Sequence, residues 1–361
     1  MNAHRSIYER APATRLATGP LTPDFTRTVA SSTGLLTSYG NGGAVTPLVL
    51  PYYMTEFREV KHYLGVQDHF RRPAHDSLKK EPGTLAQVFE GRIENRSFKS
   101  QPYGLRSRMT DDDIREADRG IDVRLQKQFW LASQLALDEE YEGVEFLTTQ
   151  ANYATGHFTT VTPWDAVGAD PISNFRTAMG TILTDCGGLI DRSAVEFVLA
   201  IGYDGYATLE SNPDLVDRWA SISNNKSAVP ERQWIAQALG ISRIEVSEMA
   251  AGPTIETTTA PVKTDNVFVW PATTDKAALL LVDKRVDLNG AGQFGMFTAA
   301  GRFGRYERFE SEYLGAPGER NAGLDVEWVQ LETDRRIVPV AVDNTTSLKM
   351  IAAHLFEDLI T

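Results

Sequence analysis

Cysteine and long apolar runs are almost absent from this chain. Cys186 is the single cysteine among 361 residues, so an intrachain disulfide and a cysteine-rich metal site are both excluded. The longest unbroken apolar run is Ala277–Val282, far shorter than the roughly 20 residues that span a membrane as a helix. The N-terminal sequence lacks the apolar core of a signal peptide. We therefore expect no cleaved secretion signal, no membrane contact and a reducing compartment.

Positive charge is also scarce. Lys and Arg total 36 against 48 Asp and Glu, which gives a net charge of −12 at pH 7. Because contact with phosphates requires a basic surface, this charge excludes a generic nucleic-acid binder. The remaining composition, 42% apolar and 23% charged, is that of an ordinary globular chain. Its length suits one large domain or two modest ones.

Motifs of nucleotide and hydrolase chemistry are missing or lie in the wrong context. No G-x-x-x-x-G-K-[ST] or G-x-S-x-G segment occurs. Gly290–Gly295 matches G-x-G-x-x-G, but no strand directly precedes it and a glycine-rich, aromatic segment follows, so we interpret it as a loop. The carboxylates fall on expected helix faces and turns, where no acid/base pair can be nominated. No catalytic residue and no cofactor are predicted.

Metal binding is not predicted either. The six histidines are His4, His62, His69, His75, His157 and His354. The spacings among His62, His69 and His75 do not match the i, i+4 pair of a helical metal site. We expect these three side chains to lie on the surface or to be partly buried. Cys186 ends an amphipathic segment and is expected to be a small core residue, not a nucleophile.

The longest helical pattern covers Thr110–Thr148. Thr110 and the three aspartates after it can cap a helix start and favour its positive end. From Ile121 onwards, apolar residues recur every three to four positions on two stripes. Gly120 indicates a break, so the sequence predicts a short helix and then one of about 25 residues, roughly 37 Å long. Two apolar stripes predict packing on both sides of this helix.

Acidic residues crowd this segment. Residues 110–147 carry eleven acids and four bases, a net charge of −7. The helix macrodipole disfavours the anions at the C-terminal end. Either this end is a solvated acidic face, or a basic surface lies against it. The acids of this end are Asp138, Glu139, Glu140, Glu142 and Glu145.

A basic segment precedes the helix. Residues 68–109 hold nine bases and five acids, a net charge of +4. Leu85–Arg92 and Arg96–Gly104 nearly alternate in polarity on either side of a polar turn at Glu94–Asn95, which predicts a long two-stranded hairpin. An isolated hairpin is marginally stable in water, and a projecting one cannot easily fold back over the helix that leaves its own base.

The expected partner of this basic hairpin is the acidic helix of a neighbouring copy, which would build a homo-oligomer. The residues predicted to contact a neighbouring subunit are Arg92, Arg96 and Lys99 of the hairpin and Asp138, Glu139, Glu140, Glu142 and Glu145 of the helix.

The rest of the chain mixes helices and strands without regular βαβ alternation, so the predicted fold class is α+β. Residues 1–47, rich in Thr, Ser, Gly and Pro, indicate an extended arm, and Asp170-Pro171 indicates a helix start. Further helices are expected at Gly202–Leu209, Pro213–Trp219, Glu231–Leu239 and Leu348–Leu359. Strands are expected at Val195–Ile201, Arg243–Met249, Val267–Trp270, Ala278–Val282, Val326–Leu331 and Ile337–Val342, and a loop or twisted ribbon at Leu288–Leu324.

The order of these parts resembles the major capsid proteins of tailed bacteriophages, specifically the lambda coat-protein-like branch of the Hong Kong 97 fold. The resemblance covers about residues 48–361. Its most specific pieces are Trp164-Asp165 through Asp170-Pro171 and the stretch Val195–Trp219, which includes VLAIGYDGYATLESNPDLVDRW. Each piece alone is a weak signal, and their order and spacing together carry the resemblance.

This resemblance implies a division of the chain into the parts of such a subunit. The N-terminal arm would comprise residues 1–47 and the E-loop hairpin residues 68–109. The peripheral domain, with the spine helix, would comprise residues 48–67 and 110–164, and residues 326–361 would return to it. Residues 165–325 would form the axial domain, which meets its copies around the symmetry axes.

The function implied is that of a head protein that assembles through pentamers and hexamers into an icosahedral shell around double-stranded DNA, without sequence-specific binding. It would form in the host cytoplasm and reside in the virion. Its partners would be further copies, a scaffold, a portal and, in some heads, a decoration protein. An acidic subunit suits a shell that must release its DNA. The alternatives are an encapsulin-like compartment shell and, less favoured, a soluble oligomeric enzyme.

Overall fold

The computed structural model describes residues 43–65, 93–110, 123–186, 190, 192–223, 229–251, 267–270, 276–284, 298–306, 312–314, 326–343 and 348–360. The chain divides into two compact units. The larger unit comprises Asn41–Tyr103, Gln134–Glu307 and Asp334–Thr361, and the smaller unit comprises Met1–Gly40, Gly104–Ser133 and Arg308–Thr333. Nearly all of the predicted N-terminal arm lies outside the described residues.

The larger unit contains a five-stranded sheet, here called the β6 sheet. Its strand order is β5 (Phe158–Thr160), β14 (Ala353–Glu357), β10 (Lys276–Asp283), β6 (Val195–Gly202) and β7 (Arg243–Ser247). β10 pairs antiparallel with both β6 and β14, whereas the outer pairs β6–β7 and β5–β14 are parallel. β6 and β10 are almost entirely buried along their length, which explains their continuous apolar sequences.

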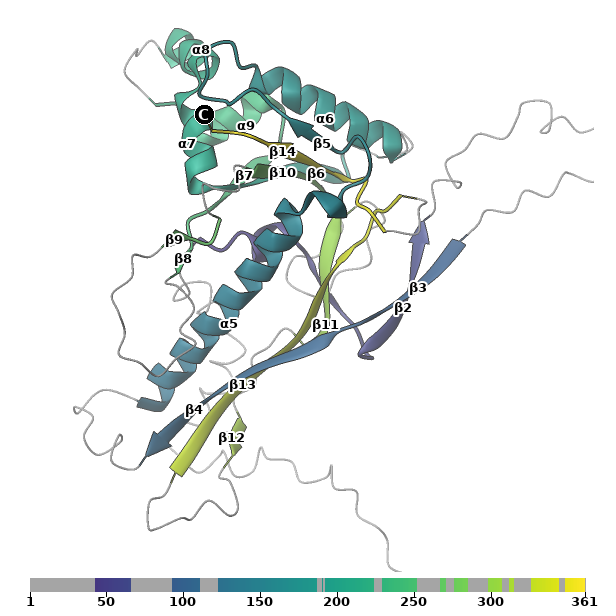
Figure 1. Cartoon of the computed structure of the whole chain (residues 1–361), viewed down its shortest axis with the longest axis vertical. Helices are drawn as coiled ribbons and strands as arrows, with labels where there is room; N and C mark the ends of the chain where they lie inside the picture. Colours follow the sequence, from purple (N-terminus) through teal and green to yellow (C-terminus); the bar gives the residue numbers. More distant parts are fainter. Residues whose placement is uncertain are drawn as a thin grey trace, which may run out of the picture. The chain divides into compact units, whose positions relative to one another are not determined.

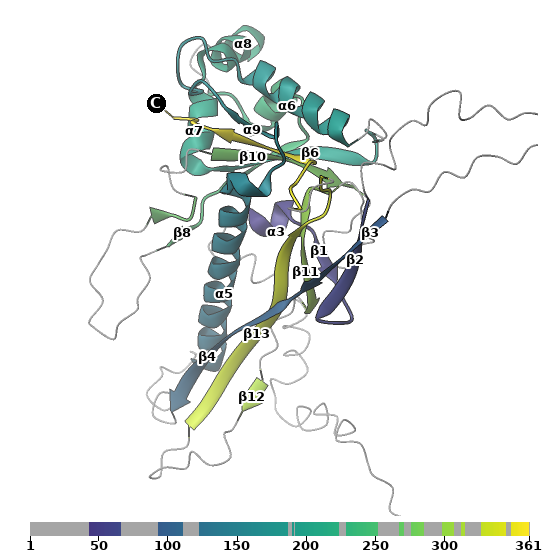
Figure 2. The same ribbon diagram turned by 45° about the vertical axis from the view of Figure 1, so that its right-hand side comes forward.

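Helices cover this sheet, as Figures 1 and 2 show. α6 (Pro171–Asp185) and α9 (Arg232–Leu239) lie together on one face, and α7 (Tyr203–Ser211) leads into α8 (Pro213–Ser223). α6 begins as its sequence predicts: Asp170 accepts a hydrogen bond from the Ser173 amide at 3.0 Å, and Pro171 occupies the first turn. Its inward stripe, including Phe175 and Ile182, is buried.

The second main sheet, here called the β11 sheet, has the order β1 (Tyr52–Met54), β11 (Ala300–Tyr306), β13 (Val326–Pro339) and β12 (Glu312–Leu314), and β4 (Gln101–Thr110) also pairs with β13. Within the larger unit an aromatic cluster holds its β1 end. Tyr53 stacks on Phe303 with ring centroids 4.7 Å apart, and Phe98 meets the same ring edge-on at 4.7 Å.

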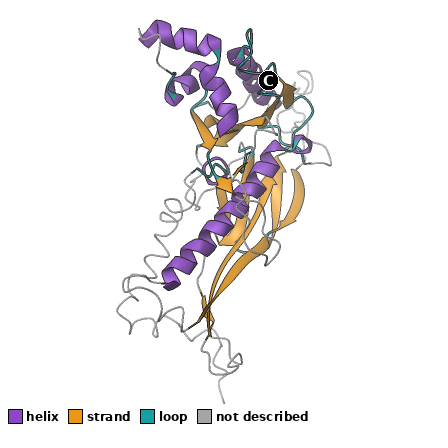
Figure 3. Ribbon diagram, turned by 60° about the vertical axis from the view of Figure 1, so that its left-hand side comes forward, coloured by secondary structure: helices purple, strands orange, loops and turns teal. Residues whose placement is uncertain are grey.

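α5 (Val123–Thr148) is one uninterrupted helix of 26 residues (Figure 3). It confirms the predicted long helix. In the larger unit its residues Leu135, Val144 and Leu147 are buried, and the short helix α3 (Thr46–Val49) lies beside its C-terminal half (Figure 2). The other short elements are a 3-10 turn at Gln150–Asn152, β8 (Ala250–Ala251) and β9 (Val267–Phe268).

The predicted hairpin turn at Glu94–Asn95 is wrong. Both residues lie in β3 (Ile93–Lys99), which pairs antiparallel with β2 (Glu59–Gly65), so that Glu94 faces Leu64 and Asn95 faces Tyr63. A polar dipeptide without Gly or Pro does not force a turn, and pairing with β2 keeps it extended. The segment that joins the two strands, residues 66–92, lies outside the described residues.

The predicted closing helix at Leu348–Leu359 is also wrong, since the segment contains strand β14. Residues 350–356 are all buried, and a strand buried on both faces has no polar face to distinguish it from a helix. The two strands expected at Val326–Leu331 and Ile337–Val342 are instead the single strand β13. Thr110 is the last residue of β4, and the short helix predicted before Gly120 lies outside the described residues.

The predicted elements that correspond to β6, β7, β10, α7, α8 and α9 are confirmed, with each end displaced by at most four residues. The expected strand Leu85–Arg92 and much of the expected ribbon Leu288–Leu324 lie outside the described residues. The division into arm, hairpin, peripheral and axial parts stays a prediction. Strand β14 belongs to the β6 sheet through its pairing with β10, so residues 353–357, which were assigned to the peripheral domain, pair with residues assigned to the axial domain.

Candidate functional site

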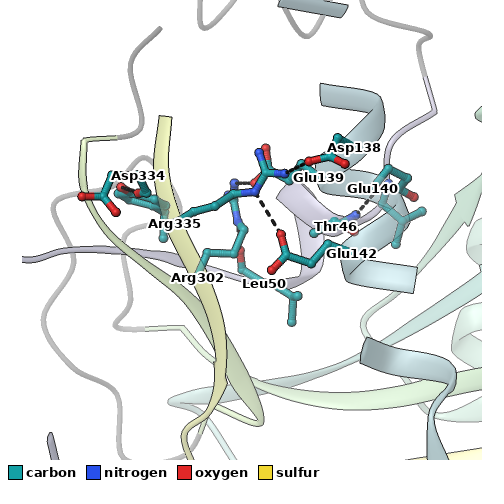
Figure 4. Close-up of polar contacts among 11 residues, drawn as sticks. Thr46, Leu50, Asp138, Glu139, Glu140, Glu142, Arg302, Asp334 and Arg335 are labelled. Carbon is teal, nitrogen blue, oxygen red and sulfur yellow. Dashed lines mark hydrogen bonds and ion pairs between the residues drawn. The ribbon is translucent and has the colours of Figure 1, made fainter. Parts of the chain in front are cut away.

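The acidic end of α5 meets basic side chains of its own chain (Figure 4). Arg335 of β13 is 1% exposed and binds two carboxylates one helical turn apart. Its Nη2 donates to Asp138 at 2.8 Å and its Nε to Glu142 at 3.1 Å. The guanidinium also lies over the ring of Tyr103, 4.5 Å from the centroid. The second of the two sequence interpretations, a basic surface against the helix end, is therefore confirmed.

Arg302 of β11 is the second buried arginine of this cluster. Its Nη1 donates to the Glu139 carboxylate, and its Nε donates to the Leu50 carbonyl at 3.0 Å. The guanidinium lies 5.6 Å from the ring centroid of Tyr52. Arg302 thus links α5, the chain before β1 and the β11 sheet through one side chain.

Burial and the neighbouring arginines shift the pKa values of the carboxylates in this cluster in opposite directions. Burial raises the pKa of Glu142 above its ordinary value, although the adjacent Arg335 opposes this effect. Asp334 is completely buried, which by itself would raise its pKa, but hydrogen bonds from Arg305 and Ser100 hold that pKa below its ordinary value. Arg305 Nε lies 2.7 Å from the Asp334 carboxylate.

Glu140 is different, because its carboxylate is completely buried and binds neutral donors. Its Oε2 accepts from the amide of Thr46 at 2.8 Å, and both oxygens lie 3.0 Å from the amide of Val45. Its Oε1 also accepts from the Ser247 hydroxyl at 2.9 Å. Glu140 has no exposed area left for a neighbouring subunit, which corrects its inclusion among the predicted inter-subunit contacts.

The other predicted contact residues fall into two groups. Asp138, Glu139 and Glu142 have arginine partners in their own chain. Lys99 at the end of β3 and Glu145 on α5 are exposed. Arg96 lies in β3 opposite His62, and Arg92 lies outside the described residues. The contact of these residues with a neighbouring copy stays a prediction.

Sequence reasoning missed a buried histidine cluster beneath α6. Nδ1 of His157 lies 2.9 Å from the Ala353 carbonyl, and its Nε2 lies 2.6 Å from the Asp185 carboxylate. Both ring nitrogens therefore have a hydrogen-bonding partner within the fold. His157, Asp185 and Ala353 lie far apart in the sequence, and no local spacing could have indicated the cluster.

His354 packs beside His157, with ring centroids 6.3 Å apart, and its Nε2 lies 3.0 Å from the Thr159 hydroxyl. Burial and, to a smaller extent, the adjacent His157 lower the pKa of His354 to about 4. Both histidines are buried. The hydrogen bonds of the two histidines connect the chain at β5 with strand β14.

Cys186 follows the last residue of α6 and is buried, as predicted. Burial, with a smaller effect from Asp185, raises the pKa of its thiol to about 12. Since the thiolate is the reactive form, this cysteine is not suited to nucleophilic chemistry.

The described part of the chain contains neither clustered metal ligands nor a membrane-spanning helix. Among its residues, no group of three His, Cys, Asp or Glu side chains lies close enough to hold a metal ion. Its helices include none that is long and apolar enough to span a bilayer. The glycine motif at Gly290–Gly295 lies outside the described residues.

Comparison with known proteins places the fold. No family model matches the chain, and no curated protein matches it by sequence. Among solved structures, a phage-related protein from Bordetella bronchiseptica RB50 superposes with a TM-score of 0.61 at 13% identity, covering 90% of this chain and 97% of its own.

Two further structures match at similar coverage. The capsid of a native GTA particle has a TM-score of 0.52 at 12% identity, covering 87% of this chain and 89% of its own. A chain of Mycobacterium phage Bobi has a TM-score of 0.51 at 10% identity, covering 88% and 91%. The chain therefore has the Hong Kong 97-like fold of phage capsid proteins, the α+β fold that the sequence resemblance implied.

Proposed function

We propose that this chain is a major capsid protein, which assembles through pentamers and hexamers into an icosahedral shell that encloses phage DNA. The observation that carries the proposal is the shared fold, which extends over about nine tenths of this chain and of the phage-related protein and capsid chains that it matches. Such coverage leaves little of the chain for a separate activity. The protein would reside in the virion after assembly in the host cytoplasm.

Exposed apolar side chains support self-association. Phe57 is 70% exposed, Ile222 68% and Trp130 56%. Single exposed apolar residues are common on soluble proteins, but large ones on several elements supply the area that copies bury when they associate. The proposal therefore assigns such side chains to subunit contacts.

Different parts of the chain would make different subunit contacts during assembly, as in other subunits of this fold. The predicted E-loop, residues 68–109, would lie over an adjacent subunit, where Arg92, Arg96 and Lys99 approach acids such as Glu145. The predicted axial domain, residues 165–325, would meet its copies around the symmetry axes. A scaffold, a portal and, in some heads, a decoration protein would be further partners.

Double-stranded DNA would be the content of the shell and not a sequence-specific ligand. Net −12 per subunit repels phosphate, which suits a container that must fill and empty. An encapsulin-like compartment shell would have the same fold but would enclose protein cargo, so the contents of purified particles separate the two functions.

The test is to size the purified protein by light scattering at low and high salt and to analyse what the particles contain. Particles of many subunits, or five- and six-membered rings that associate as salt changes, are expected. A second protein at constant stoichiometry inside the particles would favour the compartment shell. A compact monomer or dimer at every salt concentration would contradict both shell functions and favour a soluble oligomeric enzyme.

A further inference from the structure

Residues 43–51 connect the two main sheets, and all the groups involved belong to the larger unit. On the side of the β6 sheet, the Glu248 amide donates to the Gly43 carbonyl at 3.2 Å, and Arg243 Nη2 donates to the Leu48 carbonyl at 3.0 Å. On the side of the β11 sheet, the Arg302 amide donates to the Pro51 carbonyl at 2.8 Å. One short segment thus bonds to strands of both sheets.

Glu140 of α5 binds this segment through its side chain. Its carboxylate binds the amides of Val45 and Thr46 in the segment and the hydroxyl of Ser247 at the end of β7 (Figure 4 shows Glu140 and Thr46). A buried carboxylate that lost these donors would remain desolvated without compensation, which is strongly unfavourable. The segment is therefore held at one position relative to α5 and β7.

The fit between α5 and the segment is close. A Cβ atom placed on Gly143, one turn after Glu140, would lie 1.9 Å from Thr46 Oγ1 and 2.7 Å from Thr46 Cβ. No side chain can occupy position 143 unless Thr46 moves. The glycine and the carboxylate therefore specify the same placement of Thr46 by two independent means.

We propose that Glu140 is a positioning residue that clasps residues 43–51 and, through them, holds the β6 sheet and the β11 sheet in one fixed arrangement. The segment directly follows the N-terminal residues, so a force or a partner acting on those residues would reach both sheets through this clasp. A local contact would order only Val45 and Thr46. If Glu140 acts as a clasp, the hydrogen-exchange protection of two distant amides, those of Glu248 and Arg302, also depends on it.

Hydrogen exchange measured on the unassembled subunit distinguishes a local contact from a clasp. In Glu140→Gln one acceptor oxygen becomes an amide donor that faces N–H groups, so exchange should rise about tenfold or more at Thr46–Leu50. The clasp predicts a comparable rise at the amides of Glu248 and Arg302. Glu145→Gln, the same chemical change at an exposed position of α5, should leave all of these rates unchanged. A rise confined to Val45 and Thr46 would overturn the proposal.

A second pair of variants tests the clasp without removing the carboxylate. Gly143→Ala should displace Thr46 and raise exchange at the same distant amides. Adding Thr46→Gly removes the colliding atoms and should restore protection at Glu248 and Arg302. If Gly143→Ala leaves these two amides protected, or if the double variant fails to restore them, the segment does not connect the sheets. This test also serves if Glu140→Gln does not fold.

The consequence for assembly rests on the proposed capsid function and has its own readout. Particles of Glu140→Gln, imaged beside the parent, should differ in diameter or include irregular forms. Assembly failure of the parent would contradict the capsid function but leave the exchange result valid. Normal exchange at Glu248 and Arg302 with altered particles would contradict the clasp and leave the capsid function intact.

Discussion

Burial changes the properties of individual side chains in ways that their sequence neighbours do not indicate. Arg335, Asp334, Glu140, His157 and His354 are charged or titratable residues that are almost completely buried. Each has partners contributed by distant parts of the chain. Local patterns assign such residues to the surface, because most of them are exposed in proteins. Sequence analysis therefore found the acids of α5 but not their arginine partners or the histidine cluster.

His354 should make the stability of the fold depend on pH. The unfolded state takes up a proton near pH 6.5, but the folded state does so only at about 4. Above pH 6.5 this histidine is neutral in both states and the free energy of unfolding has its full value. Between pH 6.5 and about 4, the free energy of unfolding decreases by about 1.4 kcal/mol for each pH unit. Urea unfolding near neutral pH and at about pH 5 should show a loss of about 2 kcal/mol in the parent that is absent in His354→Gln. Equal losses in both would contradict the assignment.

At the scale of elements, hydrophobic pattern and capping chemistry determined most of what could be predicted. The helical period gave α5 to within a few residues, and Asp170-Pro171 gave the start of α6. Two segments whose local sequence favours another structure were not predictable without the distant strands with which they pair. β3 needed β2, and β14 needed β10, before their sequences could be told from a turn and a helix.

Removing Arg335 should strongly destabilise the packing of β13 against α5. Arg335→Ala leaves the half-buried Glu142 without its base and opens a cavity beside Tyr103, so we expect a loss of about 3 kcal/mol in the free energy of unfolding. Arg336→Ala, at the exposed neighbouring position, should cost less than about 0.5 kcal/mol. Chemical denaturation measures both. Similar small effects in the two variants would mean that the ion pairs contribute little.

The start of α6 allows a smaller prediction. Asp170→Ala removes the acceptor of the Ser173 amide and should lower the free energy of unfolding by about 1 kcal/mol. Asp170→Asn keeps an acceptor at the same place and should lose only a few tenths of that amount. If alanine and asparagine behave alike in thermal unfolding, the cap does not stabilise the helix.

At the scale of the whole molecule, the charge distribution predicts how copies recognise each other. Lys99→Glu, a change at an exposed position, should leave the free energy of unfolding within about 0.5 kcal/mol of the parent, since exposed charges contribute little to a single subunit. Assembly at low salt should be impaired, and combining this change with Glu145→Lys should restore part of it. Assembly unaffected across salt concentrations would exclude this charge pairing, although the fold would be unchanged.

The central claim is that copies of this chain form a closed shell, and negative-stain electron microscopy of the purified protein tests it most directly. Closed particles tens of nanometres across, or five- and six-membered rings that associate into them, are the predicted result. A uniform field of compact monomers or dimers under every salt condition would contradict the capsid function, while leaving the Hong Kong 97-like fold in place.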